Sequence, residues 1–255
     1  MNERGESRVA LVTGGGKGVG AGVARVLCGA CIRCCVNCNS NPAMAEETVS
    51  AIRAAGGEAF VYQADVSDPA QVNAMVGAVI ERYGRLDILV NNAAMQPNHY
   101  IDEYDAAALQ KLWSINIGGY WRCAKAAVPH LRKSPMGRIV NMCSIHANRP
   151  TCFDAGYAMT KGAIRMFTRE LALELTRDNI TVNAITLGGC RIEFKTGNPK
   201  WTMQVPVEVG NPALRGVSRL VESADVGETI LFLCGEGAAA ITGDCIRIDR
   251  GLILV

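Results

Sequence analysis

Apolar runs of strand length alternate along this chain with longer segments that carry apolar residues at helical spacing. The intervening segments, such as 43–55 and 69–83, begin near Asn, Ser or Asp, as capped helices do. Parallel strands need helix-length connections, and nearly continuous apolar strands suit burial on both faces of a sheet. We therefore expect a doubly wound α/β fold, with a seven-stranded, mostly parallel sheet and helices on both faces. The expected strands are Val9 to Thr13, Arg33 to Cys38, Ala59 to Gln63, Leu86 to Asn91, Arg138 to Cys143, Ile180 to Ile185 and Cys245 to Asp249.

The length and charge of the chain limit the class of protein it can be. Its 255 residues, 49% of them hydrophobic, suit one α/β domain, and no linker or repeat divides residues 1–255. The net charge of +2 is spread along the chain, so we expect no nucleic-acid partner. The polar start, and the lack of an apolar run near the ~18 residues of a membrane span, predict a cytoplasmic protein without a membrane partner. The long aperiodic stretch 188–216 is the expected lid.

Five of the 11 cysteines fall close together, at Cys28, Cys31, Cys34, Cys35 and Cys38. That spacing superficially suggests a metal or iron–sulfur site. On the second expected strand, however, Cys34 and Cys35 point to opposite faces, so the cluster does not converge on one ion. We expect reduced thiols that pack as small apolar residues, and no metal. A metal-sensing or redox-sensing protein is the alternative, and it predicts stoichiometric metal in the purified sample.

Glycines follow the first expected strand directly, in the run Thr13-Gly14-Gly15-Gly16-Lys17-Gly18-Val19-Gly20, and a helical apolar pattern begins at Val19. In a strand, glycine turn and helix, the backbone can approach a pyrophosphate. The charge of that group then lies over the free N–H groups and the positive dipole end of the helix. The turn therefore predicts dinucleotide binding rather than close helix packing alone. Its TGxxxGxG spacing resembles that of the short-chain dehydrogenase/reductase family, which implies a Rossmann fold.

The choice of dinucleotide is indicated by the end of the second strand. An acidic side chain there would bind the adenosine ribose hydroxyls and repel a phosphate. The run Val36-Asn37-Cys38-Asn39-Ser40 has no acid, and the next carboxylate is Glu46. Lys17 in the glycine turn is a cation that can approach a 2′-phosphate, with a solvated loop lysine as the plain alternative. We expect NADP(H), with NAD(H) as the alternative cofactor.

Tyr157 and Lys161 lie one helical turn apart at the start of the helical segment 155–176. The spacing places both side chains on one face, where an ammonium favours phenolate and lowers the pKa of tyrosine from its usual value near 10. Such a pair alone occurs by chance on many helices. Here it is accompanied by Ser144, which ends the strand that begins at Arg138 and so lies at the carboxyl edge, where open α/β sheets bind ligands.

Together these motifs resemble the short-chain dehydrogenase/reductase family over nearly the whole chain, up to Ile241-Thr242-Gly243-Asp244. The resemblance implies a hydride transfer between nicotinamide and a carbonyl or alcohol carbon, with four catalytic residues. Tyr157 would exchange the proton, Ser144 would orient the oxygen, Lys161 would lower the tyrosine pKa and hold the ribose, and Asn116 would keep a relay water. The expected cofactor contacts are Gly14, Gly16, Lys17, Gly18, Val19, Gly20, Asn37, Asn39, Ser40, Asp65, Val66, Asn92, Ala93, Tyr157, Lys161 and Gly188.

The expected substrate contacts are Ser144, His146 and Tyr157. The segment from Ser144 to Pro150 looks like that of glucose 1-dehydrogenase-like members, whereas other members of similar sequence reduce 3-oxoacyl thioesters. His146 either recognises a hydroxyl-bearing substrate or is a loop histidine satisfied by backbone groups. The side chains of the expected lid are specificity candidates or ordinary surface residues. These are Arg191, Glu193, Lys195 and Trp201.

Several positions depart from the family pattern. Leu187 replaces a proline, Ile192 stands where a hydroxyl residue would hold the carboxamide, and Ala94, Cys31 and Arg250 replace glycines. An alanine at a positive φ would cost about 1 kcal/mol. These changes keep open the alternative of a catalytically impaired dinucleotide-binding sensor or scaffold. We also expect a homotetramer through the helices of 118–133 and 155–176, because the tail 252–255 is apolar.

Overall fold

The computed structural model describes residues 7–150, 154–191 and 220–254, which form one seven-stranded sheet. The strands follow the order β3-β2-β1-β4-β5-β6-β7, and each neighbouring pair is parallel. The predicted sheet is confirmed, and it is parallel throughout the described residues. The strands are β1 (Val9–Val12), β2 (Arg33–Cys38), β3 (Ala59–Gln63), β4 (Ile88–Asn91), β5 (Arg138–Ser144), β6 (Thr181–Leu187) and β7 (Cys245–Ile248).

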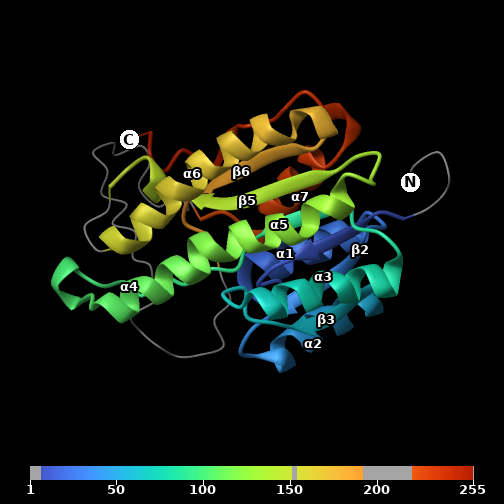
Figure 1. The fold of residues 1–255 in the computed structure, drawn as a ribbon, viewed down its shortest axis with the longest axis horizontal. Helices are drawn as coiled ribbons and strands as arrows, with labels where there is room; N and C mark the ends of the chain where they lie inside the picture. The colour runs from blue at the N-terminus through green and yellow to red at the C-terminus, as the bar shows by residue number, and fades with distance from the viewer. Residues whose placement is uncertain (1–6, 151–153, 192–219, 255) are drawn as a thin grey trace.

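Helices cover both faces of the sheet, as predicted (Figure 1). Apolar residues of α1, α2 and α7 pack on one face, and those of α3, α5 and α6 pack on the other. The α-helices of the described residues are α1 (Gly18–Gly29), α2 (Pro42–Ala54), α3 (Pro69–Tyr83), α4 (Ala106–Trp113), α5 (Gly119–Leu131), α6 (Ala155–Leu175) and α7 (Ser223–Leu233). A π-helix, η2 (Ser114–Gly118), joins α4 to α5, and a short 3-10 helix, η3 (Ile145–Ala147), follows β5.

The strand order reverses between β1 and β4, because β2 and β3 lie to one side of β1 and the later strands lie beyond β4. At such a switch point the connections leave toward opposite faces and open a crevice at the carboxyl ends of the strands. The turn after β1, the segment after β4 and Ser144 at the end of β5 all lie at this edge. The fold therefore brings together the three motifs that are separate in the sequence.

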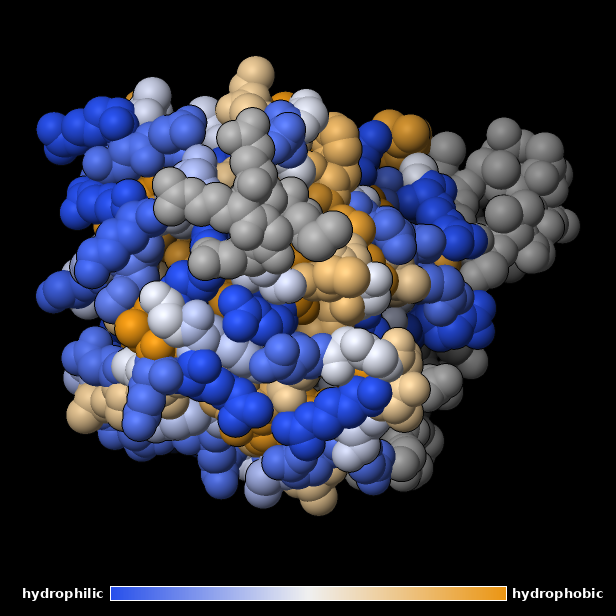
Figure 2. All heavy atoms as spheres, turned by 90° about the vertical axis from the view of Figure 1, so that its right-hand side faces the viewer, coloured by the Kyte–Doolittle hydropathy of each residue, from blue (hydrophilic) through white to orange (hydrophobic). Residues whose placement is uncertain are grey.

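The amino ends of the strands form the opposite edge, on the face shown in Figure 2, where hydrophilic residues gather. A depression of about 1520 Å³ lies at this edge. Its cations serve the fold: Arg8 donates to the carbonyl of Cys234 at the end of α7, and Arg33 donates to the carbonyl of Ser7 at 2.9 Å. Helix C-termini carry partial negative charge that such cations neutralise. We therefore assign this edge a structural role.

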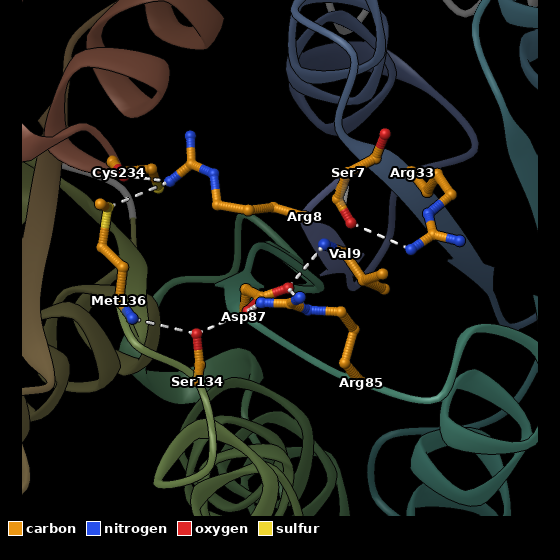
Figure 3. A network of polar contacts seen from close by, with 9 residues as sticks. All are labelled: Ser7, Arg8, Val9, Arg33, Arg85, Asp87, Ser134, Met136 and Cys234. Carbon is orange, nitrogen blue, oxygen red and sulfur yellow. Dashed lines mark hydrogen bonds and ion pairs between the residues drawn. The ribbon is translucent and has the colours of Figure 1, made fainter. Parts of the chain in front are cut away.

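A buried carboxylate organises the same edge (Figure 3). Asp87 is 0% exposed and accepts hydrogen bonds from the amide of Val9 at 2.9 Å, from the Arg85 guanidinium at 2.7 and 2.8 Å, and from the Ser134 hydroxyl at 2.5 Å. These donors come from β1, from the residues before β4 and from the α5–β5 connection. Asp87 therefore ties three segments together at the start of the central strands.

The cysteines of the N-terminal cluster lie on both sides of the sheet. Cys28, Cys34 and Cys38 belong to the core under α1 and α2, whereas Cys35 belongs to the core under α3 and α5. The opposite orientation of Cys34 and Cys35 is thus confirmed. Burial raises the pKa of the Cys35 thiol, and a hydrogen bond with Cys28 together with burial raises that of Cys34. Among the described residues no group of three His, Cys, Asp or Glu side chains is placed to hold a metal ion.

Two of the glycine replacements lie in the left-handed region of backbone space. Cys31 has φ +60° and Arg250 has φ +46°, so glycine would suit both positions better. Ala94 is not among the residues with positive φ, and it incurs no such strain. Cys31 lies before β2, at the amino edge of the sheet, whereas Arg250 follows β7 at the carboxyl edge.

Candidate active site

Two polar side chains, Thr13 and Asn92, hold the glycine turn after β1 in place. Thr13 accepts hydrogen bonds from the amides of Asn92 and Ala93 through its hydroxyl, at 2.9 and 3.1 Å. The Asn92 amide group donates to the carbonyls of Thr13 and Gly14 at 2.9 and 3.0 Å. The turn after β1 and the segment after β4 therefore form one unit. Asn92 and Ala93, both predicted cofactor contacts, lie in that unit.

The glycines of the turn leave no space for a side chain. A Cβ on Gly20 would lie 2.4 Å from the carbonyl oxygen of Gly14, and one on Gly16 would lie 2.8 Å from the Cβ of Ala45. Gly14 has φ +60°, and its Cβ would lie 2.9 Å from the Cα of Ala93. Lys17 is the N-cap of α1, whose first turn receives no side-chain cap. The free amides at this helix start suit a pyrophosphate, so the residues present fit a dinucleotide.

The residues predicted at the adenosine end divide into two groups. Asn37 is 1% exposed, accepts from the Gly14 amide at 3.1 Å and donates to the Ala64 carbonyl at 3.0 Å, so its side chain supports the turn from within. Asn39, Ser40 and Lys17 are exposed at the same edge. These three side chains, unlike that of Asn37, are accessible to a ligand from solvent.

The other predicted cofactor contacts also lie at the carboxyl edge. Asp65, after β3, accepts from the Ser67 amide at 2.8 Å, and its hydrogen bonds with Ser67 and Asn39 outweigh burial and lower its pKa. Val66, the next residue, is buried. Gly188 follows β6, and a Cβ there would lie 2.7 Å from the Cβ of Asp249. The predicted lid residues Ile192, Glu193, Lys195 and Trp201 lie outside the described residues; Arg191 is described and pairs with Glu222 at 2.8 Å.

Ser144, Tyr157 and His146 meet at the carboxyl edge of β5. Burial raises the pKa of Tyr157, and a hydrogen bond between its phenol and Ser144 acts in the opposite direction. The His146 ring packs edge-on against the Tyr157 ring, with 5.6 Å between centroids and an angle of 86°. Burial lowers the pKa of His146, which favours neutral imidazole. The serine, the phenol and the histidine therefore form one cluster.

Lys161 lies on the same side of α6 as Tyr157, as the four-residue spacing predicts. Its Nζ donates to the carbonyl of Met142 at 2.8 Å and lies 5.4 Å from the Tyr157 ring centroid. The same carbonyl accepts the Tyr120 hydroxyl at 3.0 Å. Burial lowers the pKa of Lys161 to about 8. The ammonium is thus held on β5, near the phenol, without a hydrogen bond to it.

Asn116 is fully buried in the π-helix that joins α4 to α5. Its amide donates to the Met95 carbonyl at 2.9 Å and to the Thr160 hydroxyl at 3.1 Å, and its oxygen accepts from the Met95 amide at 2.9 Å. Thr160 in turn donates to the carbonyl of Tyr157 at 2.7 Å. Asn116 therefore ties the segment after β4 to the turn of α6 that carries Tyr157, and its side chain is engaged with protein groups.

Sequence reasoning missed three residues that shape this cluster. Tyr120 shares the Met142 carbonyl with Lys161, while Asp154 and Tyr104 hydrogen-bond to each other at 2.7 Å beside Tyr157. Asp154 carried one usable signal, since an Asp that precedes a helical segment is a favoured N-cap. The other two have no local pattern, because their partners lie far away in the chain.

The comparison with known families decides which family this fold belongs to. The model of the short chain dehydrogenase family matches residues 8–202. The chain belongs to the short-chain dehydrogenase family. A glucose 1-dehydrogenase of Bacillus subtilis is 29% identical over 97% of this chain and 95% of its own length. A 3-oxoacyl-acyl-carrier-protein reductase of Synechocystis is 30% identical over 97% of this chain and 98% of its own length.

Solved structures agree with these relatives. A variant of actinorhodin polyketide ketoreductase with NADPH superposes with a TM-score of 0.86 at 30% identity, covering 96% of this chain and 97% of that one. As a short-chain dehydrogenase, the protein is an oxidoreductase that acts on CH–OH or carbonyl groups with a nicotinamide dinucleotide. The family resemblance stated from the sequence is confirmed. Among the described residues, no helix is both long enough and apolar enough to cross a membrane.

Proposed function

We propose that this short-chain dehydrogenase is an NADP(H)-dependent enzyme in which Ser144, Tyr157 and Lys161 act on a carbonyl or secondary alcohol. The observation that carries the proposal is the convergence of these side chains at the carboxyl edge of β5, where the Tyr157 phenol bonds to Ser144. That edge also holds the glycine turn whose geometry fits a dinucleotide. A proton donor, an orienting hydroxyl and a cofactor cradle therefore lie at the same edge of the sheet.

Each side chain has a distinct task in this mechanism. Ser144 donates a hydrogen bond to the substrate oxygen and orients it, while Tyr157 gives its proton to that oxygen in reduction or accepts it in oxidation. Lys161 brings positive charge beside the phenol and favours phenolate as the proton leaves. Asn116 fixes the turn of α6 that presents Tyr157, so it supports the relay by placement. When bound, nicotinamide supplies or accepts the hydride.

A panel of ketones, sugars and acyl thioesters, followed by NADPH absorbance, tests this function. Turnover of a sugar would support the glucose 1-dehydrogenase-like assignment with His146 as a substrate contact, and turnover of 3-oxoacyl thioesters would support the reductase-like one. Tight NADPH binding without turnover of any member of the panel would contradict the proposal.

The predicted lid at 188–216 remains part of the proposal, as the segment that closes over the substrate.

The preference for NADP(H) rests on the exposed residues at the end of β2. Asn39, Ser40 and Lys17 carry no negative charge, and Lys17 adds a positive one. Replacing Asn39 with Asp places a carboxylate where the 2′-phosphate is expected, so the Kd for NADPH should rise about tenfold or more through charge repulsion. The Kd for NADH should change much less, because NADH lacks that phosphate.

Quenching of protein fluorescence on titration with each nucleotide measures both constants. Asn179→Asp is the matched control, because this exposed asparagine lies in the α6–β6 connection, away from the carboxyl edge. Equal weakening of NADPH and NADH by Asn39→Asp would remove the argument for a phosphate at this position.

We further propose a homotetramer built on α5 and α6. Large apolar side chains are exposed on these helices: Trp121 at 52%, Met159 at 56%, Met166 at 54% and Leu173 at 75%. A small hollow of about 230 Å³ lies between the two helices and is lined by Tyr120, Trp121 and Phe167 among others. Apolar surface of this kind marks interfaces.

The described cysteines are free thiols, which suits our proposed cytoplasmic location.

Replacing Trp121 with Glu should break this assembly, because a carboxylate buried in an apolar interface is left unpaired. Multi-angle light scattering should then show dimers or monomers where the parent chain forms tetramers. Ile101→Glu, at a residue that is 78% exposed on η1 (Ile101–Glu103), serves as control and should leave the mass unchanged. A monomeric parent chain would contradict the tetramer directly.

A further inference from the structure

A single buried carboxylate, Asp154, joins the start of α6 to the segment that follows β4. It caps α6 by accepting from the Tyr157 amide at 2.8 Å. The same group accepts the Tyr104 phenol at 2.7 Å and the Asn98 amide at 2.9 Å. Asp154 is only 3% exposed. Serine or threonine would suffice as a cap, so capping alone does not account for a buried carboxylate with three donors from two segments.

The loop held by Asp154 lies against the catalytic turn. Asn98 has φ +58°, a left-handed conformation that costs free energy unless the surroundings fix it. The ring of Tyr104 lies over Gly156, where a Cβ would approach it to 2.8 Å. Met95, earlier in the same segment, is bound on both sides by Asn116. Residues 95–104 are thus clamped to α6 at the level of Tyr157.

Charge around Tyr157 is supplied by the elements packed against it. The titratable groups that face Tyr157 are Cys143 of β5, Tyr120 of α5, His146 of η3, Lys161 of α6, and Asp154, the N-cap residue of α6. Within the described chain Asp154 is the carboxylate of this set. Burial raises the pKa of Tyr157 most, and the charges of Cys143 and Asp154 raise it further. Lys161 is held on the Met142 carbonyl and gives the phenol no hydrogen bond.

We propose that Asp154 is a positioning residue: its buried carboxylate clamps residues 98–104 to the turn of α6 that carries Tyr157 and brings a negative charge beside that tyrosine, so that the centre favours reduction of neutral carbonyl compounds. The inference rests on the proposed function, because it takes Tyr157 as the group that transfers the proton. A carboxylate near a phenol favours phenol over phenolate. Reduction needs the phenol as acid, whereas oxidation needs the phenolate as base. The same negative charge repels a substrate carboxylate next to the reacting carbon.

Asp154→Asn tests the charge. The asparagine oxygen still caps α6, but the negative charge is gone, so the pKa of Tyr157 falls. Phenolate then forms at lower pH, and the acidic limb of the alcohol-oxidation profile should move down by about one pH unit. The alkaline limb of carbonyl reduction should move in the same direction, because it reports loss of the same proton. The kcat profiles in both directions are the measurement.

Tyr104→Phe separates the clamp from the charge. It removes the phenol donor and leaves the carboxylate in place, so the clamp on residues 98–104 weakens and KM for the carbonyl substrate should rise several-fold. The pH limbs should stay where they are. A shift of the limbs by Tyr104→Phe equal to that of Asp154→Asn would overturn the electrostatic part of the proposal.

Two further variants guard against a folding defect. Asp154→Ser keeps a capping hydroxyl without charge, and it should reproduce the pH shift if Asp154→Asn fails to fold. Asp68→Asn is the matched control, because Asp68 caps α3 through the Ala70 and Gln71 amides at 2.8 and 3.2 Å. It should lower stability slightly and leave the pH limbs and KM unchanged.

Ultraviolet difference titration of the phenols, with Tyr157→Phe as reference, reads the pKa of Tyr157 without substrate. A lowered pKa in Asp154→Asn is the expected result, and an unchanged pKa would overturn the inference. This readout also separates the two proposals: an enzyme without turnover contradicts the proposed function, whereas the titration still reports whether Asp154 holds the phenol protonated.

Discussion

Replacing Tyr157 with phenylalanine should lower kcat for carbonyl reduction by about three orders of magnitude, within the range that proton transfer by a positioned side chain contributes. The substitution removes one hydroxyl and keeps the ring, so the edge contact with His146 at 5.6 Å and the packing of α6 are retained. Ser144 remains to orient the substrate oxygen but has no acid beside it. The Kd for NADPH should therefore stay within about twofold while turnover is lost.

Stopped-flow or steady-state assays with the best substrate of the panel measure this loss. Tyr83→Phe is the matched control, since it also removes the hydroxyl of a buried tyrosine but lies at the amino edge of the sheet, where it lines the structural depression. Its kcat should equal that of the parent chain. If Tyr157→Phe kept more than about a tenth of the parent kcat, the proton would have to come from another group. His146 is then the first candidate, because its ring touches the phenol.

Lys161 and the Tyr157 phenol are not hydrogen-bonded to each other, so another group is needed to link them. The sequence spacing predicts an ammonium beside the phenol, and the structure places that ammonium on the Met142 carbonyl, with a pKa lowered by burial to about 8. Burial raises the pKa of Tyr157. In our proposal a ribose hydroxyl of the bound cofactor would link Lys161 to Tyr157. Such a hydroxyl can accept a hydrogen bond from the ammonium and donate one to the phenol oxygen.

The sequence predicts those parts of the molecule whose signal is local. The ranges of β2 and β3 and that of α3 match the predicted segments, because apolar period and the cap at Asp68 lie within the elements themselves. The position of Tyr157 and Lys161 on the same side of α6 also follows from their spacing of one helical turn. Ser144 was placed at the carboxyl edge by its position at the end of β5, and the parallel sheet brings it to α6.

Other features depend on contacts that no local pattern records. Asn37 was predicted as a cofactor contact from its place near the end of β2, yet its side chain is 1% exposed. A sheet covered on both faces buries alternate side chains on either side, so the period of a strand does not tell which polar residue reaches solvent. Asp154 receives donors from Asn98 and Tyr104, about fifty residues earlier, and its role emerges only when these segments meet.

Replacing Asp87 with alanine should lower the free energy of unfolding by about 3 kcal/mol, the lower part of the range for breaking a buried ion pair. Asp87 is fully buried, and its loss removes the acceptor of the Val9 amide and of the Ser134 hydroxyl, and one partner of the Arg85 guanidinium (Figure 3). The Arg85 side chain is 20% exposed, so water recovers part of that cost. The remaining penalty falls at the start of β1 and β4, on which the crevice depends.

Guanidinium denaturation at one protomer concentration measures the difference, because the midpoint of an oligomer depends on concentration. Asp178→Ala is the matched control: Asp178 pairs with Arg132 at 2.8 Å, but both side chains are partly exposed, so about 0–1 kcal/mol is expected. A loss for Asp87→Ala no larger than that of the control would show that the amino-edge network does not stabilise the sheet. The expected larger loss follows from burial, since a hydrated partner recovers its hydrogen bonds from water and a buried one does not.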